Sequence, residues 1–347
     1  KVINEAMKLG TDNDHGHDFV QDFETRYLPQ TRSPIITGWD EIDSITRGGL
    51  GKRELGVVVA PTGAGKSMAL VHIGSRAVAM GKTVIQYTLE LAETTIGLRY
   101  DSAITGVPLS MTFEYKDQIK EKITNIEGQL IVKEYPTKSA TTKTLENHLD
   151  RLRQKGVEPD MIIVDYADLL RPARTSYKQE LRHSLGDIYE ELRGIAQKYD
   201  MPVWTASQTN RGGLNAEVIT MEAISEAFNK CFVADFICTI SRTAQDKTEN
   251  TGRMFVAKNR NGPDGMVYPM NMDTSKVYLE VLPVEDGGTI DSVVAKTKEE
   301  QQKWLANKYK NYSGTSQKKQ EEKQFKDNMK NELRTLKEQL DKEKEAS

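Results

Sequence analysis

The sequence is 347 residues long, carries a formal net charge of −3 and contains 29% charged residues. This length suits one large α/β domain with appendages or two small domains. The near-neutral charge excludes a generic nucleic-acid coat, so any nucleic-acid contact must be local. No apolar run is long enough to cross a membrane and no secretory leader is present, which predicts a cytoplasmic protein without membrane contact.

The two cysteines and the first residue add further expectations. Cys231 and Cys238 form neither a C-x-x-C pair nor a disulfide framework, which favours a reducing compartment and a core position for both side chains. The chain begins at Lys1 without a methionine, so we expect that an upstream segment, such as an N-terminal domain, lies outside it.

Residues 1–30 are polar but contain three aromatic residues at a helical spacing. Phe19, Phe23 and Tyr27 recur every four positions, which places their rings on one face of a short helix. Such a face either folds onto its own domain or docks on a neighbouring subunit. His15 and His17 have no third ligand nearby, which favours a solvated turn over a metal site.

The segment Ala60–Ser67 reads APTGAGKS and lies between an apolar run that predicts a strand and a stretch that predicts a helix. A strand, a glycine-rich loop and a helix in this order bring backbone N–H groups and a helix N-terminus to a triphosphate. Lys66 is predicted to reach the β- and γ-phosphates, and the Ser67 hydroxyl to bind Mg²⁺. Ala60 stands where the usual pattern has Gly. The predicted nucleotide-binding residues are Thr62, Gly63, Ala64, Gly65, Lys66 and Ser67.

Short apolar runs alternate with helical patterns from about Ile35 to Leu282, which predicts βαβ units and a mostly parallel twisted sheet flanked by helices. Most of the runs are apolar almost throughout, as expected for strands covered on both faces. The predicted strands are Leu55–Ala60, Thr83–Thr88, Leu130–Glu134, Met161–Asp165, Val203–Ser207, Phe236–Ile240 and Met254–Ala257. The predicted crossover helices are Met68–Met80, Thr144–Lys155 and Gln179–Tyr199, and Asn261–Gly265 predicts a tight turn between two late antiparallel strands.

Three predicted strands end in polar side chains suited to phosphate chemistry. Asp165 ends an apolar strand about a hundred residues after the phosphate loop, where an NTPase places the acid that holds Mg²⁺ or its water. Glu90 follows the strand after the phosphate-loop helix and is predicted to orient or deprotonate the attacking water, with Glu93 as its competitor. Gln208 is predicted to contact the γ-phosphate or that water and to report hydrolysis to the loop that follows.

Lys258 and Arg260 lie two positions apart at the end of a late strand, so their side chains point the same way. A cationic pair at a domain edge suits a contact with phosphates bound by the next subunit. A pair of solvated charges is the alternative.

After about Val294 the sequence turns to Lys, Glu and Gln with few apolar residues. Apolar residues at a helical spacing between Phe325 and Leu340 predict a solvated or partly ordered helix, with a partner contact as the alternative. We therefore expect an N-terminal linker helix region (1–30), a central domain (31–293) and a charged C-terminal tail (294–347).

Taken in order, the motifs resemble the ATPase domain of the DnaB family of hexameric replicative helicases, and within it the branch of T4-type bacteriophages. The resemblance covers about residues 15–280 and depends on five segments: APTGAGKS at 60–67, YTLEL at 87–91, IIVDY at 162–166, SQTNR at 207–211 and the Lys-x-Arg-x-Gly of 258–262. It implies a RecA-like P-loop NTPase core that uses ATP and Mg²⁺. It also implies an ATP-dependent DNA helicase that assembles into a ring, most simply a hexamer.

The site residues of the family transfer to matching positions of this sequence. By resemblance, Lys66, Ser67 and Asp165 are nucleotide and Mg²⁺ ligands, Glu90 is the catalytic glutamate, Gln208 is the sensor, and Lys258 with Arg260 is the trans-acting pair. The resemblance also favours docking of the aromatic face near Phe19 on an adjacent subunit.

In this family, single-stranded DNA binds in the centre of the ring, through the loops that follow the strands ending at Asp165 and Gln208. Short basic loops with glycines suit a sequence-independent grip on phosphates. The candidate DNA-binding residues are Arg171, Arg174, Lys178, Arg211, Gly212 and Gly213. By the same resemblance, we expect primase and a helicase loader to bind through an N-terminal domain that lies outside this sequence, so contacts with those partners cannot be read from these residues.

Two other functions stay open on the residues. A RecA-like recombinase or recombination mediator would form filaments on DNA with the same core, although the motif at 258–262 favours a helicase. A non-motor ATP-binding scaffold would hydrolyse ATP at a rate indifferent to single-stranded DNA, although the basic loops favour a motor.

Overall fold

The computed structural model describes residues 16–28, 32–172, 181–209, 218–219 and 231–284, with only the backbone described in 181–184. All of these residues fall within one compact unit, Lys1–Ile290. The strands are β1 (Leu55–Ala60), β2 (Thr83–Thr88), β3 (Gln129–Glu134), β4 (Met161–Asp165), β5 (Val203–Gln208), β6 (Phe236–Ser241), β7 (Thr251–Asn259), β8 (Val267–Asp273) and β9 (Tyr278–Val281). The α-helices are α2 (Asp40–Ile45), α3 (Lys66–Ala79), α4 (Glu93–Thr105), α5 (Lys116–Thr124), α6 (Thr142–Gln154), α7 (Leu181–Tyr199) and α9 (Ala244–Glu249), and the 3₁₀-helices are η1 (Glu24–Tyr27), η2 (Leu109–Met111) and η3 (Ala167–Leu169).

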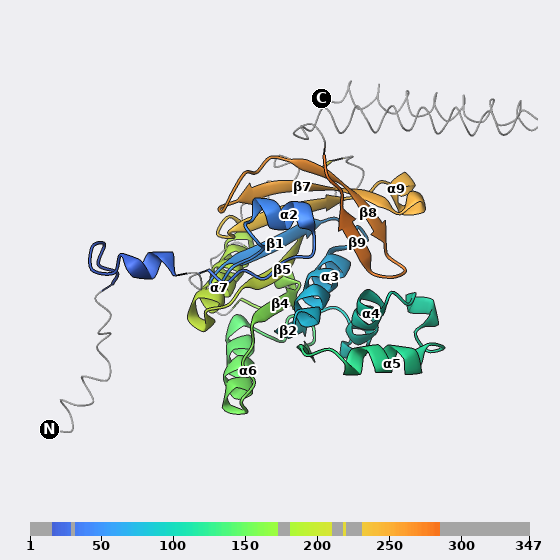
Figure 1. The fold of residues 1–347 in the computed structure, drawn as a ribbon, viewed down its shortest axis with the longest axis horizontal. Coiled ribbons are helices and arrows are strands. Elements are labelled where there is room, and N and C mark those ends of the chain that lie inside the picture. The colour runs from blue at the N-terminus through green and yellow to red at the C-terminus, as the bar shows by residue number, and fades with distance from the viewer. Residues whose placement is uncertain (1–15, 29–31, 173–180, 210–217, 220–230, 285–347) are drawn as a thin grey trace, which may run out of the picture. The chain divides into compact units, whose positions relative to one another are not determined.

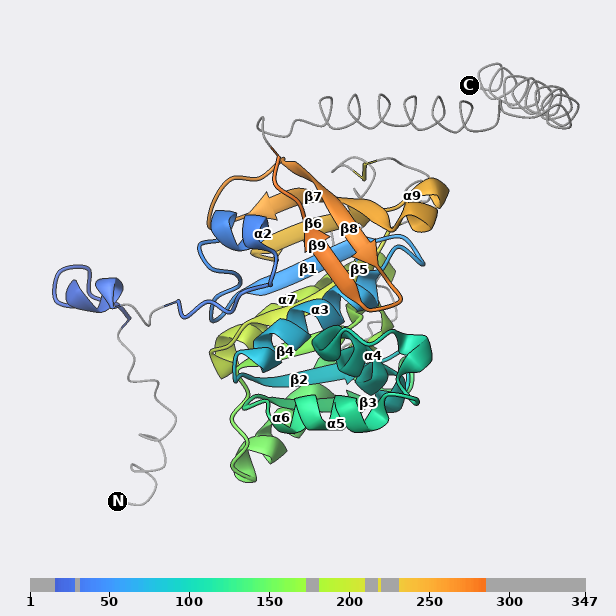
Figure 2. The same ribbon diagram turned by 45° about the vertical axis from the view of Figure 1, so that its right-hand side comes forward.

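Within the described residues, the strands form one nine-stranded sheet in the order β3-β2-β4-β5-β1-β6-β7-β8-β9 (Figures 1 and 2). The first six strands of this order pair in parallel, and β7, β8 and β9 extend the sheet as antiparallel hairpins. This confirms the predicted mostly parallel sheet with a late antiparallel addition. Because the parallel strands run the same way, their last residues meet at one end of the sheet, which we call the carboxyl end, and their first residues meet at the amino end.

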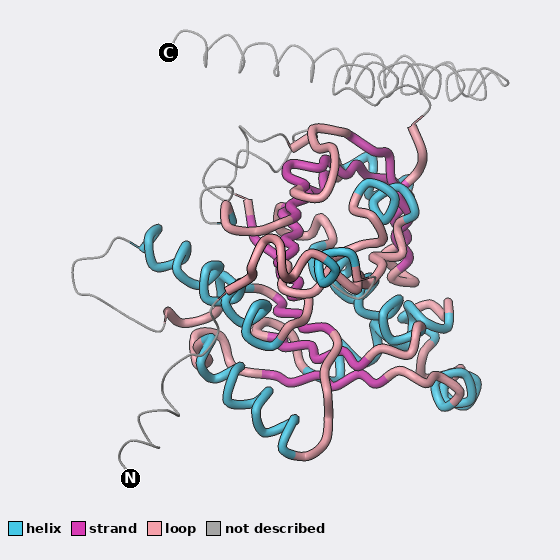
Figure 3. The backbone as a smooth tube through the Cα atoms, turned by 60° about the vertical axis from the view of Figure 1, so that its left-hand side comes forward, coloured by secondary structure: helices cyan, strands magenta, loops and turns pink. Residues whose placement is uncertain are grey.

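Helices cover both faces of the sheet (Figures 2 and 3). On one face α3 packs against β1, β2, β4 and β5, and α4 packs against α3. On the other face α7 packs against β1 and β5, and α6 lies beside α7. This double cover explains why the central strands read as apolar runs, because neither face of those strands meets water.

The core contains large aromatic side chains that are almost fully buried. Trp204 on β5 meets Phe236 on β6 edge to face, with ring centroids 5.9 Å apart, and the Trp39 indole N–H donates to the Leu279 carbonyl at 3.1 Å. Cys231 and Cys238 are both buried, which confirms their predicted place in the core.

Strand β7, Thr251–Asn259, is longer than the predicted strand Met254–Ala257 and includes the charged residue Arg253. The Arg253 guanidinium pairs with the Asp246 carboxylate at 2.9 Å, and both side chains are buried. A buried charge with a good partner does not interrupt a strand. The apolar run therefore marked only the middle of this strand.

The predicted amphipathic α-helix is wrong for residues 16–28, which we describe by themselves. Only the single 3₁₀ turn η1 forms there, after a series of turns. The Asp18 carboxylate accepts the backbone N–H groups of Val20 and Gln21 at 2.9 and 2.7 Å, and such local bonds compete with a helix. Phe19 and Tyr27 remain largely exposed.

The side chains of this segment gather around one cation. The Arg26 guanidinium lies 4.4 Å from the centre of the Phe19 ring and 5.1 Å from that of Phe23. The Arg26 guanidinium also contacts Nε2 of His17 at 2.9 Å, so that ring nitrogen already has a partner within the protein. Among the described residues no group of three His, Cys, Asp or Glu side chains could hold a metal ion.

Two expectations concern other parts of the chain. In the portion that is described, no helix is both long enough and apolar enough to span a membrane. The predicted tail helix, within 294–347, and His15 lie outside the described residues.

Candidate nucleotide-binding site

The predicted phosphate loop connects the carboxyl end of β1 to the first turn of α3. Gly63 and Gly65 have φ angles of 74° and 107°, a backbone region that side-chain-bearing residues rarely adopt. Gly65 directly precedes α3, whose first residue is Lys66. The first N–H groups of a helix have no partner within it, so this turn offers donors and the positive end of the helix dipole to an anion.

Ala60, which replaces the usual first glycine, is an ordinary strand residue. It is the last residue of β1, lies in register with Gln208 of β5 and is completely buried. Its φ angle is not positive, unlike those of Gly63 and Gly65. The left-handed conformation is therefore required later in the loop, and a methyl group at position 60 fits without strain.

Ser67 and Asp165 meet at this end of the sheet. The Ser67 hydroxyl donates to Oδ1 of Asp165 at 3.2 Å. The other carboxylate oxygen, Oδ2, is buried and has no hydrogen-bond partner among the described residues. Burial raises the pKa of Asp165 to about 6, against a smaller opposing effect of the Ser67 hydrogen bond. A cation beside this carboxylate would offset the cost of burying its charge.

Glu90 lies next to the same site. β2 pairs with β4 so that Thr88 stands opposite Asp165, and the Leu89 N–H donates to the Asp165 carbonyl at 2.9 Å. Glu90 follows as an exposed residue. Burial lowers the pKa of the Lys66 ammonium, and the carboxylates of Glu90 and Asp165 oppose that shift, so the three groups share one electrostatic site.

The competitor Glu93 is engaged elsewhere. Its carboxylate accepts the Glu134 N–H at 2.8 Å and pairs with the Lys133 ammonium at 3.3 Å, at the end of β3. The hydrogen bond from Glu134 lowers the pKa of Glu93. The geometry thus favours Glu90 over Glu93 as the acid of this site.

Gln208, at the end of β5, connects directly to the phosphate loop. Its amide N–H donates to the Thr62 hydroxyl at 2.7 Å, and its amide oxygen accepts from the Tyr166 hydroxyl at 3.4 Å. Asp168 accepts the backbone N–H of Gln208 at 3.3 Å. The four adjacent strands β2, β4, β5 and β1 therefore deliver Glu90, Asp165, Gln208 and the loop to one place, the usual ligand position of a parallel α/β sheet.

Two cations near this site were missed by sequence reasoning. The Arg99 guanidinium interacts electrostatically with Asp165 and Glu90, and burial lowers the pKa of Arg99. Arg99 lies on the apolar stripe of α4, between the buried Ile96 and Tyr100, and a charged residue at such a position was an available signal. The Lys247 ammonium, from α9, lies 3.8 Å from where a Cβ on Gly63 would be. No local pattern marks Lys247.

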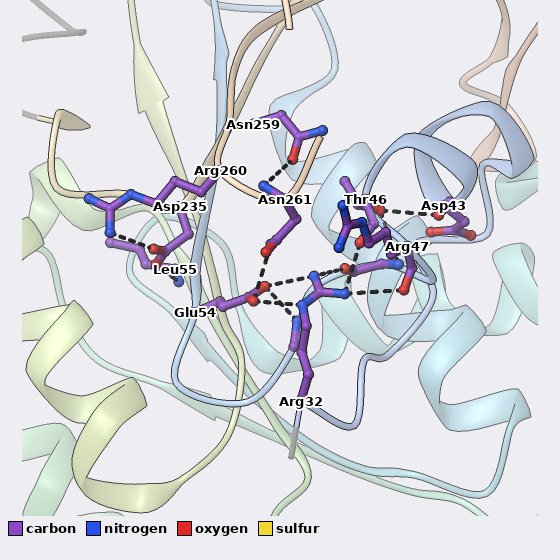
Figure 4. A network of polar contacts seen from close by, with 12 residues as sticks. Arg32, Asp43, Thr46, Arg47, Glu54, Leu55, Asp235, Asn259, Arg260 and Asn261 are labelled. Carbon is purple, nitrogen blue, oxygen red and sulfur yellow. Dashed lines mark hydrogen bonds and ion pairs between the residues drawn. The ribbon is translucent and has the colours of Figure 1, made fainter. Parts of the chain in front are cut away.

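Lys258 and Arg260 lie far from this chain's own phosphate loop. β7 ends at Asn259, which stands opposite Phe236 at the start of β6, so both cations are at the amino end of the sheet. The length of β1, about 17 Å at 3.3 Å per residue, separates this end from the loop. Arg260 pairs with Asp235 at 3.0 Å (Figure 4), and the Lys258 ammonium donates to the Phe232 carbonyl at 2.6 Å.

Of the candidate DNA-binding residues, the structure describes only Arg171, which is exposed and donates its backbone N–H to the Ala140 carbonyl at 2.8 Å. Arg174, Lys178, Arg211, Gly212 and Gly213 lie outside the described residues. Their roles stay predictions.

Comparison with known proteins identifies the family of this domain. The family model of the DnaB-like helicase C terminal domain matches residues 34–277. The DnaB-like replicative helicase of Enterobacteria phage T4 is 28% identical over 258 residues, which cover 70% of this chain and 54% of that protein. The chain thus spans about half the length of this relative.

Two solved structures share the fold. One is an isolated ATPase domain with a TM-score of 0.63 at 16% identity, with 81% of this chain and 99% of that chain covered. The other, a DnaB-like replicative helicase solved to show its interactions with primase, has a TM-score of 0.64 at 16% identity, with 82% and 71% covered. These likenesses confirm the RecA-like core. Through residues 34–277, the chain belongs to the family of DnaB-like helicase C-terminal domains.

Proposed function

We propose that this chain is the motor part of an ATP-driven, ring-forming DNA helicase that moves on single-stranded DNA in phage-type replication. The observation that carries the proposal is the position of Lys258 and Arg260 at the amino end of the sheet, whereas the phosphate loop lies at the carboxyl end. The pair cannot reach a nucleotide bound by its own chain. It suits a nucleotide bound by the next subunit.

A contact between the amino end of one subunit and the carboxyl end of the next is heterologous, since different surfaces meet. Identical subunits joined in this way form a closed ring or an open filament. Family membership favours the ring, most simply a hexamer. One ATP would bind at each interface between neighbouring subunits, which we call a seam.

Within each seam one subunit provides the cradle. Lys66 binds the β- and γ-phosphates, and the N–H groups of the first turn of α3 bind phosphate oxygens. Ser67 and Asp165 would hold Mg²⁺, which when bound neutralises phosphate charge. The buried and unpartnered Oδ2 of Asp165, beside the Ser67 hydroxyl, fits this role, because an oxygen ligand set is what Mg²⁺ prefers.

Hydrolysis needs an oriented water and compensation for charge in the transition state. Glu90 orients the water and accepts its proton, since it is the exposed carboxylate whose charge acts on Lys66 together with that of Asp165. Lys258 and Arg260 of the next subunit stabilise the charge of the transferring phosphoryl group. Gln208, bonded to Thr62 of the phosphate loop, transmits the loss of the γ-phosphate to the DNA-binding loop after β5.

Mixing of variants tests the shared site. Lys66→Ala and Arg260→Ala each lower DNA-stimulated ATP turnover, the second by about a thousandfold on the scale of arginine fingers. In an equal mixture, about a quarter of the seams join an intact loop to an intact Arg260, so turnover rises well above that of either variant alone. A mixture that stays as slow as its components would refute a site built by two subunits.

The matched control replaces the Arg260→Ala variant in the mixture by a chain that carries both substitutions. Every phosphate loop of that mixture lacks Lys66, so no recovery is expected. Turnover indifferent to single-stranded DNA would favour the ATP-binding scaffold. Filaments without strand separation would favour the recombinase. Contacts with primase or a helicase loader stay a prediction.

A further inference from the structure

Asp235 is a buried carboxylate that joins two arginines at the amino end of the sheet. Its Oδ1 pairs with Nη1 of Arg260 at 3.0 Å and accepts from Nη2 of Arg193 at 3.2 Å. Its Oδ2 accepts from Nε of Arg193 at 3.3 Å and from the Leu55 N–H at 3.0 Å. Only 7% of the Asp235 side chain is exposed. The carboxylate thus connects α7, the start of β1 and the residue that follows β7.

A second aspartate in this chain shows what part of this arrangement is ordinary. Asp160 precedes β4 as Asp235 precedes β6, and the backbone N–H of each donates to a carbonyl at the start of a neighbouring strand. The Asp160 carboxylate accepts the Thr83 N–H at 2.8 Å, as Asp235 accepts that of Leu55. Among the described residues Asp160 pairs with no arginine, and its cation is the half-exposed Lys82 at 3.7 Å. Support of a strand start therefore needs an aspartate but no arginine.

The ion pair with Asp235 fixes the Arg260 side chain but leaves part of its guanidinium unused. The ion pair with Asp235 uses Nη1, and the Arg260 N–H donates to the Asp235 carbonyl at 2.9 Å. The Arg260 side chain is still 43% exposed, so other donors of the guanidinium stay available for a phosphate. A fixed guanidinium loses less conformational entropy on binding than a free one.

The residues around Arg260 are fixed as well. The Asn261 amide donates to Glu54 at 3.2 Å, and Arg32 grips the same carboxylate with two bonds of 2.7 and 2.9 Å (Figure 4). The Asn259 amide donates to the Ile45 carbonyl at 2.9 Å. The turn that carries Arg260 is thus bonded on both sides of that residue.

We infer that Asp235 is the positioning residue of the trans-acting Arg260, and that Arg193 in turn holds the Asp235 carboxylate. This inference rests on the proposed function, in which Arg260 reaches the ATP of the next subunit. In this role Asp235 acts through Arg260 and does not itself contact the ATP or the attacking water. It sets the place and direction from which Arg260 acts, and an error of about 1 Å there is enough to slow the chemical step strongly.

The test is a double-mutant cycle on DNA-stimulated ATP turnover of the full chain, with the melting temperature measured for each variant. Asp235→Asn keeps an oxygen for the Leu55 N–H but loses the charge that holds Arg260. It lowers kcat about tenfold with little change in KM, since the interaction acts in the transition state. In the Arg260→Ala background the same substitution causes no further loss, because no guanidinium remains to be positioned.

Asp160→Asn is the matched control. It weakens the equivalent strand contact without breaking a buried ion pair, so it lowers the melting temperature less than Asp235→Asn does, while kcat stays at the wild-type value. A second variant, Arg193→Gln, leaves both strand starts intact and lowers kcat about threefold, again only when Arg260 is present.

Three results overturn the inference: wild-type kcat in Asp235→Asn, an equal fall of kcat in Asp160→Asn, or the same fold-loss with and without Arg260. If Asp235→Asn does not fold, wild-type kcat in Arg193→Gln overturns it instead. Failure of the proposed function has a different signature, because wild-type turnover in Arg260→Ala itself would remove the trans role. The inference would then fall with it.

Discussion

His72 makes the stability of the phosphate-loop helix depend on pH. It lies on α3, only 2% exposed, and its ring stacks on Trp39 with centroids 5.2 Å apart and planes 6° from parallel. Its Nε2 has no hydrogen-bond partner among the described residues. Burial, and to a lesser extent the charge of Arg76, lowers the pKa of His72 to about 3. The folded protein therefore keeps this ring neutral.

The sign and size of the effect follow from the two pKa values. In the unfolded chain a histidine titrates near its ordinary value of about 6.5. Between that pH and about 3 the unfolded state binds one more proton than the folded state, so the free energy of unfolding falls as the pH falls. Each pH unit is worth about 1.4 kcal/mol, which gives a loss of about 3 kcal/mol at pH 4.5.

The assay compares urea unfolding of the wild type and His72→Phe from pH 7 to pH 4.5. Phenylalanine keeps an aromatic ring against Trp39 but cannot take up a proton, so the variant lacks this part of the acid sensitivity. The difference between the two unfolding free energies changes by about 3 kcal/mol over this range. His17→Gln, at a half-exposed site, serves as the control. Parallel curves for the wild type and His72→Phe would show that the reasoning is wrong.

Three further predictions concern α3, α4 and the missed cations. A Cβ at Gly74 would lie 2.0 Å from the Tyr100 hydroxyl, so Gly74→Ala lowers the unfolding free energy by about 2 kcal/mol, whereas Gly97→Ala, in open space, does not. Arg99→Ala lowers kcat for ATP about tenfold, because it removes a positive charge that interacts electrostatically with Glu90 and Asp165; steady-state turnover at saturating ATP checks this. Lys247→Ala raises KM for ATP about threefold without changing kcat, since it removes a cation beside Gly63. Equal stabilities of Gly74→Ala and Gly97→Ala would contradict the first prediction. An unchanged kcat in Arg99→Ala would contradict the second, and an unchanged KM in Lys247→Ala the third.

The parallel sheet and the residues at its carboxyl end could be predicted from the sequence because the signals for both lie within single segments. A strand buried on both faces must be apolar, and the polar residue that ends it is visible in the same segment. Asp165 and Glu90 could be placed together for this reason alone, since the ends of neighbouring parallel strands meet. Their chemical roles still depend on the family resemblance and on the experiments above.

The amino end could not be predicted in the same way because its contacts join distant segments. Asp235 and Arg193 are 42 positions apart, and Glu54 and Asn261 are 207 positions apart. Nothing in either segment specifies its partner. The prediction for segment 16–28 failed for the opposite reason, because a local contact overrides the local pattern. The aromatic spacing predicted a helix, but the Asp18 carboxylate accepts the N–H groups of Val20 and Gln21 and so favours turns.

In the proposed ring, the charges at the two ends of β1 give a reason why two subunits would share one site. At the carboxyl end Lys66 and Arg99 interact electrostatically with the carboxylates of Glu90 and Asp165, Asp168 adds a negative charge near Lys66, and the Lys247 ammonium lies beside the phosphate loop. ATP would add about four negative charges, which requires further positive charge from a metal ion and from outside the chain. At the amino end Asp235 neutralises only one of two arginines, and Lys258 lies beside them. In the proposed ring, the carboxyl end of one subunit, which lacks positive charge once ATP is bound, meets the positively charged amino end of the next subunit. Nucleotide binding and subunit association are then thermodynamically linked, so that each strengthens the other by the same free energy.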